Sequence, residues 1–352
     1  MTLPILTRWD SSTVWNDSRQ RLLFVAEGFE ERTTVWLHGL DHVRYFERAV
    51  VFKYVPEKQS RLTELLEELV PRTKSEPLLL DFHRFDPSIS ELDLTQRLDG
   101  LLRNIDEIVI DISVMSKMLI MMLVFLLRKW RMDLRIIYTE PAYYAPTCAA
   151  YEANKTNLEK ALCLPTFGVH QVVRTPALSS AVMQRSPSLV IAFMSFNEQL
   201  VRALLSSISP GRLLMINGRP PRLHWREKAM LFIHRNVVDE YTQDNELDAD
   251  RNLKRTTSTL DYRETFDLLA KEFLENCYYY RIIVAPTGSK LQALGAGLFK
   301  ICAPEIHIEY PTPESFFVEG YSSKEIAGVH QVWFRGFAGL MSDIAELNGL
   351  NG

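Results

Sequence analysis

Two short loops carry hydroxyl and amine side chains directly before an apolar helical stretch, one at residues 111–117 and one at 285–290. The first loop opens at Asp111, and the groups that suit an anion are the hydroxyls of Ser113 and Ser116 with Lys117 in this loop, and Thr287, Gly288, Ser289 and Lys290 in the second. Free backbone N–H groups at the start of a helix, together with the positive end of the helix dipole, favour an anion. The pattern predicts a phosphate cradle in each half of the chain, where Gly288 lets a ligand approach the backbone. The alternative stays open that the two serines only cap helices and the two lysines are solvated.

A second pair of loops follows the first apolar strand of each half. Gly28 permits a tight turn there, Glu30 and Arg32 follow it, and Asn197 lies at the matching place in the second half. The Arg32 guanidinium could hold a phosphate or carboxylate through two hydrogen bonds. An ion pair between Arg32 and an acidic neighbour fits the same spacing. Neither G-x-G-x-x-G nor the G-x-x-x-x-G-K-[ST] phosphate loop occurs, so the chain has no dinucleotide fingerprint.

Two histidines occupy the same place in a repeated pentapeptide, Gly-Val-His-Gln-Val, at residues 168–172 and 328–332. His170 and His330 each lie between apolar residues on an expected last strand. A histidine in such a place is either a structural hydrogen-bonding residue or one of a pair of ligand contacts or general bases. The two readings stay open.

A third pair of histidines has a spacing that zinc sites use. His38 and His42 are four residues apart, which would place them on one face of a helix. Zinc needs a third protein ligand, none is assignable here, and H-E-x-x-H is absent. We therefore predict no metal site and no cofactor.

The elements that position these residues correspond in order between the two halves, with apolar strands alternating with helical stretches. The expected strands are 22–26, 49–52, 78–80, 108–110 and 135–138, and then 189–193, 212–216, 237–238, 281–284 and 306–310. The register pairs Asp81 with Asp239, Lys117 with Lys290, Tyr138 with Tyr310 and His170 with His330. Alternating strands and helices predict mostly parallel sheets covered by helices. The predicted fold is α/β, with two tandem Rossmann-like units at residues 1–176 and 177–352 related by pseudo-two-fold symmetry.

The duplication also predicts where a ligand binds. In open parallel sheets ligands bind outside the carboxyl ends of the strands, so we expect a site where the two copies face each other. Tyr138 and Tyr310 precede matching loops and could stack on a base or simply pack. We expect an asymmetric cleft, because only the first copy has an acidic residue at 111. The junction is expected at residues 177–188, and a surface loop at 242–257.

Composition narrows the class of protein. Lys and Arg total 40 and Asp and Glu 44, which gives a net charge of −4 and argues against a protein that coats duplex DNA. The four cysteines form no C-x-x-C pair, and no secretory signal is present, so we expect reduced thiols and a cytoplasmic location. The longest apolar run, residues 118–127, is too short to span a bilayer, and no membrane partner is expected.

At its first loop the chain resembles the CRISPR-associated Rossmann-fold (CARF) sensor domains. Their loop has Asp or Asn, then Ser or Thr two residues on, then Lys or Arg four residues further, and Asp111, Ser113 and Lys117 match it. The second copy keeps Thr287 and Lys290 but has Ala285 where an acid is expected. Two fused units also look like the SAVED sensor domains of anti-phage systems. The resemblance implies that the chain binds a cyclic oligonucleotide on a pseudo-two-fold axis.

Three functions follow from these observations. The leading hypothesis is a nucleotide or cyclic-oligonucleotide binding protein, acting as a sensor or partner subunit in bacterial anti-phage defence, with a protein partner from a defence operon. The second is a nucleotide-processing hydrolase or glycosidase, with Glu30, Asp111, His170 and His330 as the candidate acid–base residues. The third is a scaffold whose apolar patch would consist of Trp9, Trp15, Trp333, Phe334 and Phe337. The sequence leaves open whether the protein catalyses a reaction.

Overall fold

The computed structural model describes residues 2–9, 15, 18–56, 59–157, 164–180, 187–243, 254–318 and 320–350. The chain forms two compact units. The first unit consists of Met1–Tyr144 and Gly320–Leu347, and the second of Ala145–Glu319 and Asn348–Gly352. Each is described by itself below.

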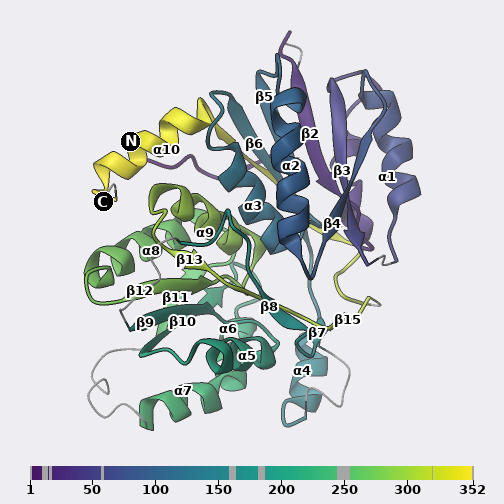
Figure 1. The fold of residues 1–352 in the computed structure, drawn as a ribbon. Coiled ribbons are helices and arrows are strands. Elements are labelled where there is room, and N and C mark those ends of the chain that lie inside the picture. The colour runs from purple at the N-terminus through teal and green to yellow at the C-terminus, as the bar shows by residue number, and fades with distance from the viewer. Residues whose placement is uncertain are drawn as a thin grey trace. The chain divides into compact units, whose positions relative to one another are not determined.

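The first unit is built on a seven-stranded sheet of order β1-β16-β6-β5-β2-β3-β4 (Figure 1). Its strands are β1 (Thr7–Arg8), β2 (Arg21–Ala26), β3 (Arg48–Val55), β4 (Leu78–His83), β5 (Glu107–Asp111), β6 (Asp133–Pro141) and β16 (Ile326–Phe334). Its helices are η1 (Glu31–Thr33), η2 (Leu37–Gly39), α1 (Leu62–Leu69), η3 (Val70–Arg72), α2 (Pro87–Leu101), α3 (Lys117–Leu127) and α10 (Phe337–Leu347). Strands β2 to β6 are parallel, whereas β16 and β1 add to the β6 edge in antiparallel fashion.

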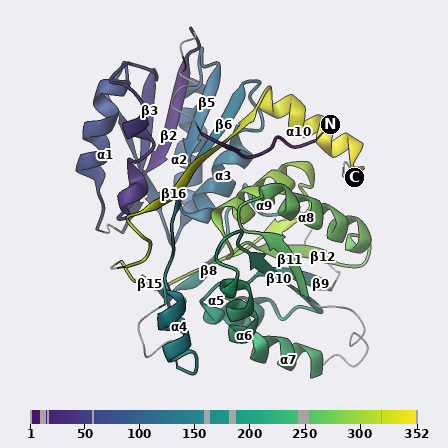
Figure 2. The same ribbon diagram turned by 180° about the vertical axis from the view of Figure 1, so that it is seen from behind.

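Both faces of this sheet are covered, as the continuous apolar runs of its strands require. All six residues of β2 and all five of β5 are buried. One face packs on α1 and on an aromatic cluster around Trp36, where Trp15, Tyr45 and Phe46 meet edge to face. Helices α2 and α3 lie against each other on the opposite face (Figures 1 and 2).

The second unit holds a five-stranded parallel sheet of order β11-β10-β9-β12-β13. Its strands are β9 (Ser188–Phe193), β10 (Arg212–Arg219), β11 (Lys254–Ser258), β12 (Arg281–Ala285) and β13 (His307–Ile308). Two separate two-stranded sheets pair β7 (Thr166–Phe167) with β15 (Ser315–Phe316), and β8 (Gln171–Val173) with β14 (Tyr310–Thr312). Its helices are α4 (Cys148–Asn154), α5 (Glu198–Ile208), α6 (Trp225–Ile233), α7 (Arg235–Gln243), α8 (Tyr262–Asn276) and α9 (Lys290–Cys302). Helices α5, α6 and α7 share one core cluster with β9, β10 and β12.

The predicted fold class is confirmed: two mostly parallel sheets flanked by helices form two Rossmann-like units. The five parallel strands of the first unit, taken as β6-β5-β2-β3-β4, have the same order as β13-β12-β9-β10-β11 in the second. The duplication seen in the sequence is therefore a duplication of topology. Numbered along each copy, both orders read 5-4-1-2-3, and the strand order reverses between the first and fourth strands, where Rossmann folds bind ligands.

One strand of the second copy was assigned wrongly from the sequence. Residues 237–238 were expected to be its third strand and Asp239 the partner of Asp81, but they lie in α7. The third strand is β11, whose first four residues lie in the stretch 242–257 that we expected to be a surface loop. Its sequence, Lys-Arg-Thr-Thr-Ser, has no apolar run, because only one of its five residues is buried at this edge of the sheet. Residues 244–253 of that loop lie outside the described part of the chain.

Each of the two strands that carry the repeated pentapeptide pairs with a strand from the other half of the chain. In the first unit β16, from the end of the chain, pairs with β6, and His330 lies opposite Tyr138. In the second unit β8, which precedes β9, pairs with β14, and Gln171 lies opposite Thr312. Each repeat thus gives its closing strand to the other, which is why the units divide near residues 144 and 320 whereas the sequence repeat divides at 176. The expected junction at 177–188 is described only in part.

Candidate functional site

The carboxyl edge of the first sheet holds the loop that the sequence singled out. Strand β5 ends at Asp111, and α3 begins at Lys117, six residues later. Ser116 is the N-cap, and its side-chain oxygen accepts a hydrogen bond from the Leu119 backbone N–H at 3.2 Å. The helix that follows is buried at ten consecutive positions, so α3 is fixed rigidly behind the loop. The structure thus shows Ser116 as a helix cap, one of the two roles considered for it.

Asp111 and Ser113 are buried and brace the loop from inside. One Asp111 carboxylate oxygen accepts hydrogen bonds from the Ser113 hydroxyl and, at 2.8 Å, from the Ser113 backbone N–H. The other accepts from the Trp36 indole N–H at 2.7 Å, and the Ser113 oxygen accepts from the Thr139 backbone N–H at 2.8 Å. Burial raises the pKa of Asp111, while these hydrogen bonds and the charge of Arg32 oppose the rise. These contacts shape the loop, and the Asp111 carboxylate is 2% exposed.

Lys117 differs from its neighbours in having no partner. Its side chain is half-buried, and its ammonium forms no hydrogen bond or ion pair with the described residues. Burial lowers its pKa to about 8. A positive charge on the first residue of a helix also lies at the unfavourable end of the dipole. The fold therefore holds a cation where its own electrostatics disfavour one, which is a common property of ligand sites.

Sequence reasoning did not single out two residues at the carboxyl ends of β3 and β4, further along the same edge of the sheet. Tyr54 is the seventh residue of β3, and its hydroxyl accepts a hydrogen bond from the Ser116 backbone N–H at 2.6 Å. Arg84 directly follows β4, and its charge acts on Tyr54. The available signal was positional, because side chains at the carboxyl ends of adjacent parallel strands gather at one edge.

Gly28, after β2, is a close-packing position at this edge. A Cβ atom there would lie 2.7 Å from the Val114 Cβ, so only glycine lets the 111–117 loop approach β2. The preceding Glu27 accepts hydrogen bonds from the Tyr54 backbone N–H at 2.7 Å and from the Ser60 hydroxyl at 2.9 Å. The loops after β2, β3 and β5 are therefore held against one another.

Glu30 and Arg32 form a buried ion pair, which was the alternative for Arg32. The guanidinium donates to both Glu30 oxygens, at 2.9 and 3.0 Å. It also donates to the Thr139 carbonyl at 2.7 Å and to the Tyr144 hydroxyl at 3.0 Å. Although burial opposes it, the Glu30 charge with the nearby tyrosines holds the pKa of Arg32 well above its ordinary value. Arg32 is 1% exposed, so its donors are used inside the protein.

The two pentapeptide histidines have different surroundings in their separate units. His330 lies 3.3 Å from the Glu140 carboxylate and stacks on the Tyr138 ring at 6.4 Å between centroids. Tyr138 is buried, and its hydroxyl is 2.7 Å from that of Tyr144. His170 is exposed in the second unit, where its backbone N–H donates to the Thr312 carbonyl.

The matching loop of the second unit is closed by its own hydrogen bonds. Ser289 caps α9 in a capping box with Gln292, and its hydroxyl donates to the Thr259 carbonyl at 2.8 Å. A Cβ on Gly288 would overlap the Gln292 side-chain oxygen, so this glycine makes room for the capping box. Thr287 is 2% exposed and donates to the Phe193 carbonyl. Lys290, the first residue of α9, is half-buried.

Asn197 caps α5 and borders a small cavity of about 230 Å³ in the second unit. Its oxygen accepts from the Gln199 backbone N–H, and its amide nitrogen donates to Thr166 and to the Gly168 carbonyl. With these bonds the Asn197 amide is occupied at both ends. The cavity is smaller than the roughly 300 Å³ at which small-molecule sites begin.

Zinc ligation by His38 and His42 finds no support in their geometry. His38 lies in the short η2 turn and faces Glu68 at 3.4 Å, and His42 follows that turn. Among the described residues no group of three or more His, Cys, Asp or Glu side chains is placed to hold a metal ion. Within that part of the chain no helix is both long and apolar enough to cross a membrane.

The aromatic residues proposed for a scaffold patch are largely core residues. Trp15, Phe334 and Phe337 are 8%, 0% and 1% exposed, so the expectation that they form a surface patch is wrong. Trp15 packs edge to face on Trp36 and Phe46.

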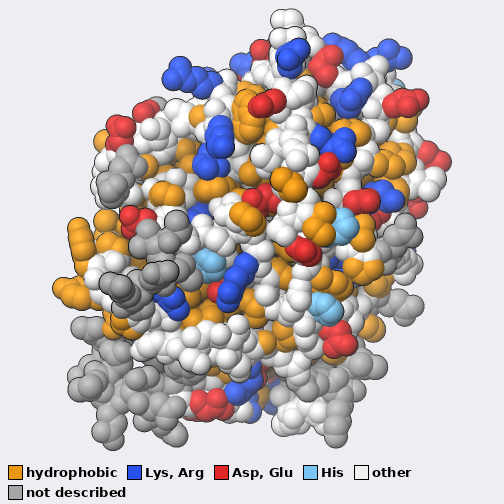
Figure 3. Space-filling view, in the orientation of Figure 1, with side chains coloured by type: hydrophobic (Ala, Val, Ile, Leu, Met, Phe, Trp, Pro, Cys, Tyr) orange, Lys and Arg blue, Asp and Glu red, His pale blue; other side chains and the backbone are white. Residues whose placement is uncertain are grey.

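On the face seen in Figure 3, Lys and Arg side chains are interspersed with Asp and Glu over the upper part of the view.

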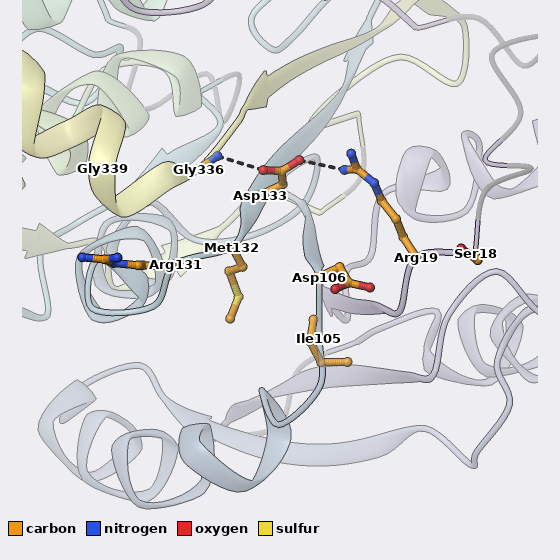
Figure 4. A pocket seen from close by; sticks show the side chains of 9 residues that line it. All are labelled: Ser18, Arg19, Ile105, Asp106, Arg131, Met132, Asp133, Gly336 and Gly339. Atoms are coloured by element: carbon orange, nitrogen blue, oxygen red, sulfur yellow. Dashed lines mark hydrogen bonds and ion pairs between the residues drawn. The ribbon is translucent and has the colours of Figure 1, made fainter.

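A larger cavity, of about 680 Å³, opens at the opposite, amino-terminal edge of the first sheet (Figure 4). Arg19 and Asp133 line it as an ion pair at 2.7 Å, and Asp133 also accepts from the Gly336 backbone N–H at 2.8 Å. Asp106 and Arg131 supply one further charge of each sign. The charges that line this cavity therefore balance.

No protein-family model and no curated protein matches this chain. Among solved structures, it is similar to a Type III CRISPR defence DNA nuclease activated by cyclic oligoadenylate, at 10% sequence identity and a TM-score of 0.37. The likeness covers 82% of this chain and 65% of the nuclease chain. It concerns the arrangement of helices and strands.

Proposed function

We propose that the protein binds a nucleotide or cyclic oligonucleotide through a phosphate at the carboxyl edge of its first sheet. The observation that carries this proposal is the Lys117 ammonium, half-buried at the start of α3 with no partner among the described residues. A phosphate oxygen supplies the missing negative charge, and the start of α3 favours the same charge. A role as a sensor or partner subunit in anti-phage defence follows from the CARF-like spacing of Asp111, Ser113 and Lys117.

The two units contribute unequally in this proposal. Among the described residues, the first unit presents an unpaired cation at the start of α3, whereas in the second unit Ser289 and Gln292 satisfy the start of α9. We therefore expect the first unit to provide the tighter phosphate contact.

The enzyme alternative has less support from the geometry. Glu30 is paired with Arg32, and Asp111 is buried with both oxygens accepting hydrogen bonds. His330 has a carboxylate neighbour in Glu140, but a general base must also reach the proton of a bound substrate. Incubation with each nucleotide at stoichiometric protein, followed by product analysis, tests it, and any turnover would support the enzyme.

Isothermal titration with cyclic di-, tri-, tetra- and hexa-adenylate, and with ATP and AMP, tests the binding proposal. We expect saturable binding of at least one compound, weakened in Lys117→Ala. Lys129→Ala is the matched control, because Lys129 is exposed beyond the other end of α3. If none of the compounds binds, or if binding is the same in both variants, the proposal is wrong.

A further inference from the structure

The amino-terminal edge of the first sheet is rich in cations. Five parallel strands begin at this edge and the antiparallel β16 ends there, so the six neighbouring strands β16-β6-β5-β2-β3-β4 each bring a segment to it (Figure 1). In that order the segments are residues 335–336, 128–133, 102–106, 18–20, 44–48 and 74–77. They contain nine Lys and Arg residues against four Asp and Glu residues, although the whole chain has a net charge of −4. The edge is therefore a basic surface on an acidic protein.

Most of the cations on this basic surface are not neutralised by neighbouring acids. Arg19 pairs with Asp133, and Lys74 pairs with Glu47. The exposed cations that have no acidic partner among the described residues are Arg44, Arg48, Arg103, Lys129, Arg131 and Arg335. Figure 4 shows Arg131 directed away from the Asp133 carboxylate. A partner of opposite charge relieves the mutual repulsion of such a group.

The order of the strands places the cations in a row. Each of the six strands has at least one Lys or Arg at this end, and neighbouring strands lie about 4.8 Å apart, so the row is about 24 Å long. The cavity of about 680 Å³ opens within the row, beside Arg19 and Arg131. Seven of the nine cations are arginines, whose planar guanidinium can hold a phosphate through two hydrogen bonds. A row of this kind fits a chain of phosphates.

The uncharged side chains of the basic surface favour a nucleic acid over a protein as the partner. Protein interfaces are organised around buried aromatic and apolar anchors. Within the six segments, all of which the structure describes, no large hydrophobic side chain is exposed. Interfaces with nucleic acids are more polar and more positively charged. We infer that this edge of the first sheet binds the phosphate backbone of a nucleic acid, with Arg103 and Arg131 among the residues that contact it. The surface lies at the opposite edge of the sheet from Lys117 and does not depend on the proposed nucleotide site.

Fluorescence anisotropy with a labelled single-stranded DNA of about 20 nucleotides and mixed sequence tests the inference. We expect saturable binding that weakens steeply as the salt concentration rises, because each neutralised phosphate releases counterions. Replacing both Arg103 and Arg131 by alanine should reduce the slope of log Kd against log salt concentration by about 1.4, at about 0.7 for each lost phosphate contact. At about 0.1 M salt this change weakens binding more than about tenfold. Both side chains are exposed, so the variant should fold as the wild type does.

A second double variant, Lys228→Ala with Lys271→Ala, is the matched control. It removes the same charge from exposed positions on α6 and α8 of the second unit. We expect it to bind the DNA with the affinity and salt dependence of the wild type. If the wild type does not bind, or if the two double variants bind equally well, the inference is wrong. Loss of binding in Lys117→Ala but not in the Arg103 and Arg131 variant would place the DNA at the start of α3 and would also overturn the inference.

Discussion

Replacing Lys117 by methionine should stabilise the free protein while weakening its binding of a phosphate ligand. Burial lowers the pKa of Lys117 from its ordinary value of 10.5 to about 8. At 1.36 kcal/mol per pKa unit, holding this charge costs at most about 3 kcal/mol of folding free energy. Since the side chain is only half-buried and keeps part of its hydration, we expect about 1–2 kcal/mol. Methionine fills a similar volume without the charge.

The stability difference between Lys117→Met and the wild type should depend on pH. Below pH 8 the ammonium is charged in both the folded and the unfolded protein, so the full cost is present. As the pH rises from about 8 to 10.5 the folded protein loses the proton first, and the cost disappears. Lys117→Met should therefore unfold at higher urea concentration than the wild type at pH 7, and at the same concentration near pH 11.

Urea unfolding of the wild type, Lys117→Met and Lys129→Met at both pH values measures this difference. The exposed Lys129 should give no stability change. In parallel titrations, loss of the proposed ion pair between Lys117 and the ligand phosphate should weaken binding about 10- to 100-fold. This factor corresponds to the about 1.5–3 kcal/mol of a hydrogen bond to a charged group. If Lys117→Met is less stable than the wild type at pH 7, by an amount that does not change with pH, then the buried Lys117 charge does not cost folding free energy and the reasoning is refuted.

Three further predictions concern the frame around the site. His234 is fully buried, and burial lowers its pKa to about 4, so the unfolded chain takes up the proton first as the pH falls. In urea unfolding, the wild type should lose up to about 3 kcal/mol of stability relative to His234→Gln between pH 6.5 and pH 4. A stability difference that does not change with pH would contradict this. Gly28→Ala should destabilise the protein by about 1–3 kcal/mol because its Cβ overlaps Val114, whereas Gly100→Ala, with open space around it in α2, should be neutral or slightly stabilising in the same assay. Gln292→Ala should cost about 1–3 kcal/mol in thermal unfolding, because it removes the capping box of α9 and a buried hydrogen bond to Thr257, yet it should leave phosphate binding at the first unit unchanged. A parallel loss of affinity would show that the second unit takes part.

The sequence by itself determined the fold class and the positions of most parallel strands, because strands buried on both faces are continuous apolar runs. It missed β11, since an edge strand with a single buried residue has no apolar pattern to detect. It also located the start of α3, where a serine cap and a lysine precede ten buried residues. These features depend on local periodicity and on helix-end chemistry, which neighbouring residues in the chain are enough to specify.

The tertiary structure decided which of the candidate side chains are available to a ligand. Arg32 and Lys117 look equally suitable in the sequence, but Arg32 is paired with Glu30, whereas Lys117 has no partner in the part of the chain that the structure describes. Tyr54 joins the site only because parallel pairing brings the ends of β2, β3 and β4 to one edge. The exchange of closing strands, which places His330 opposite Tyr138, was also hidden, because a repeat shows which segments are alike and not which sheet each one joins. Pairing and burial are long-range properties, and they decide which charged side chains are neutralised by other residues of the protein.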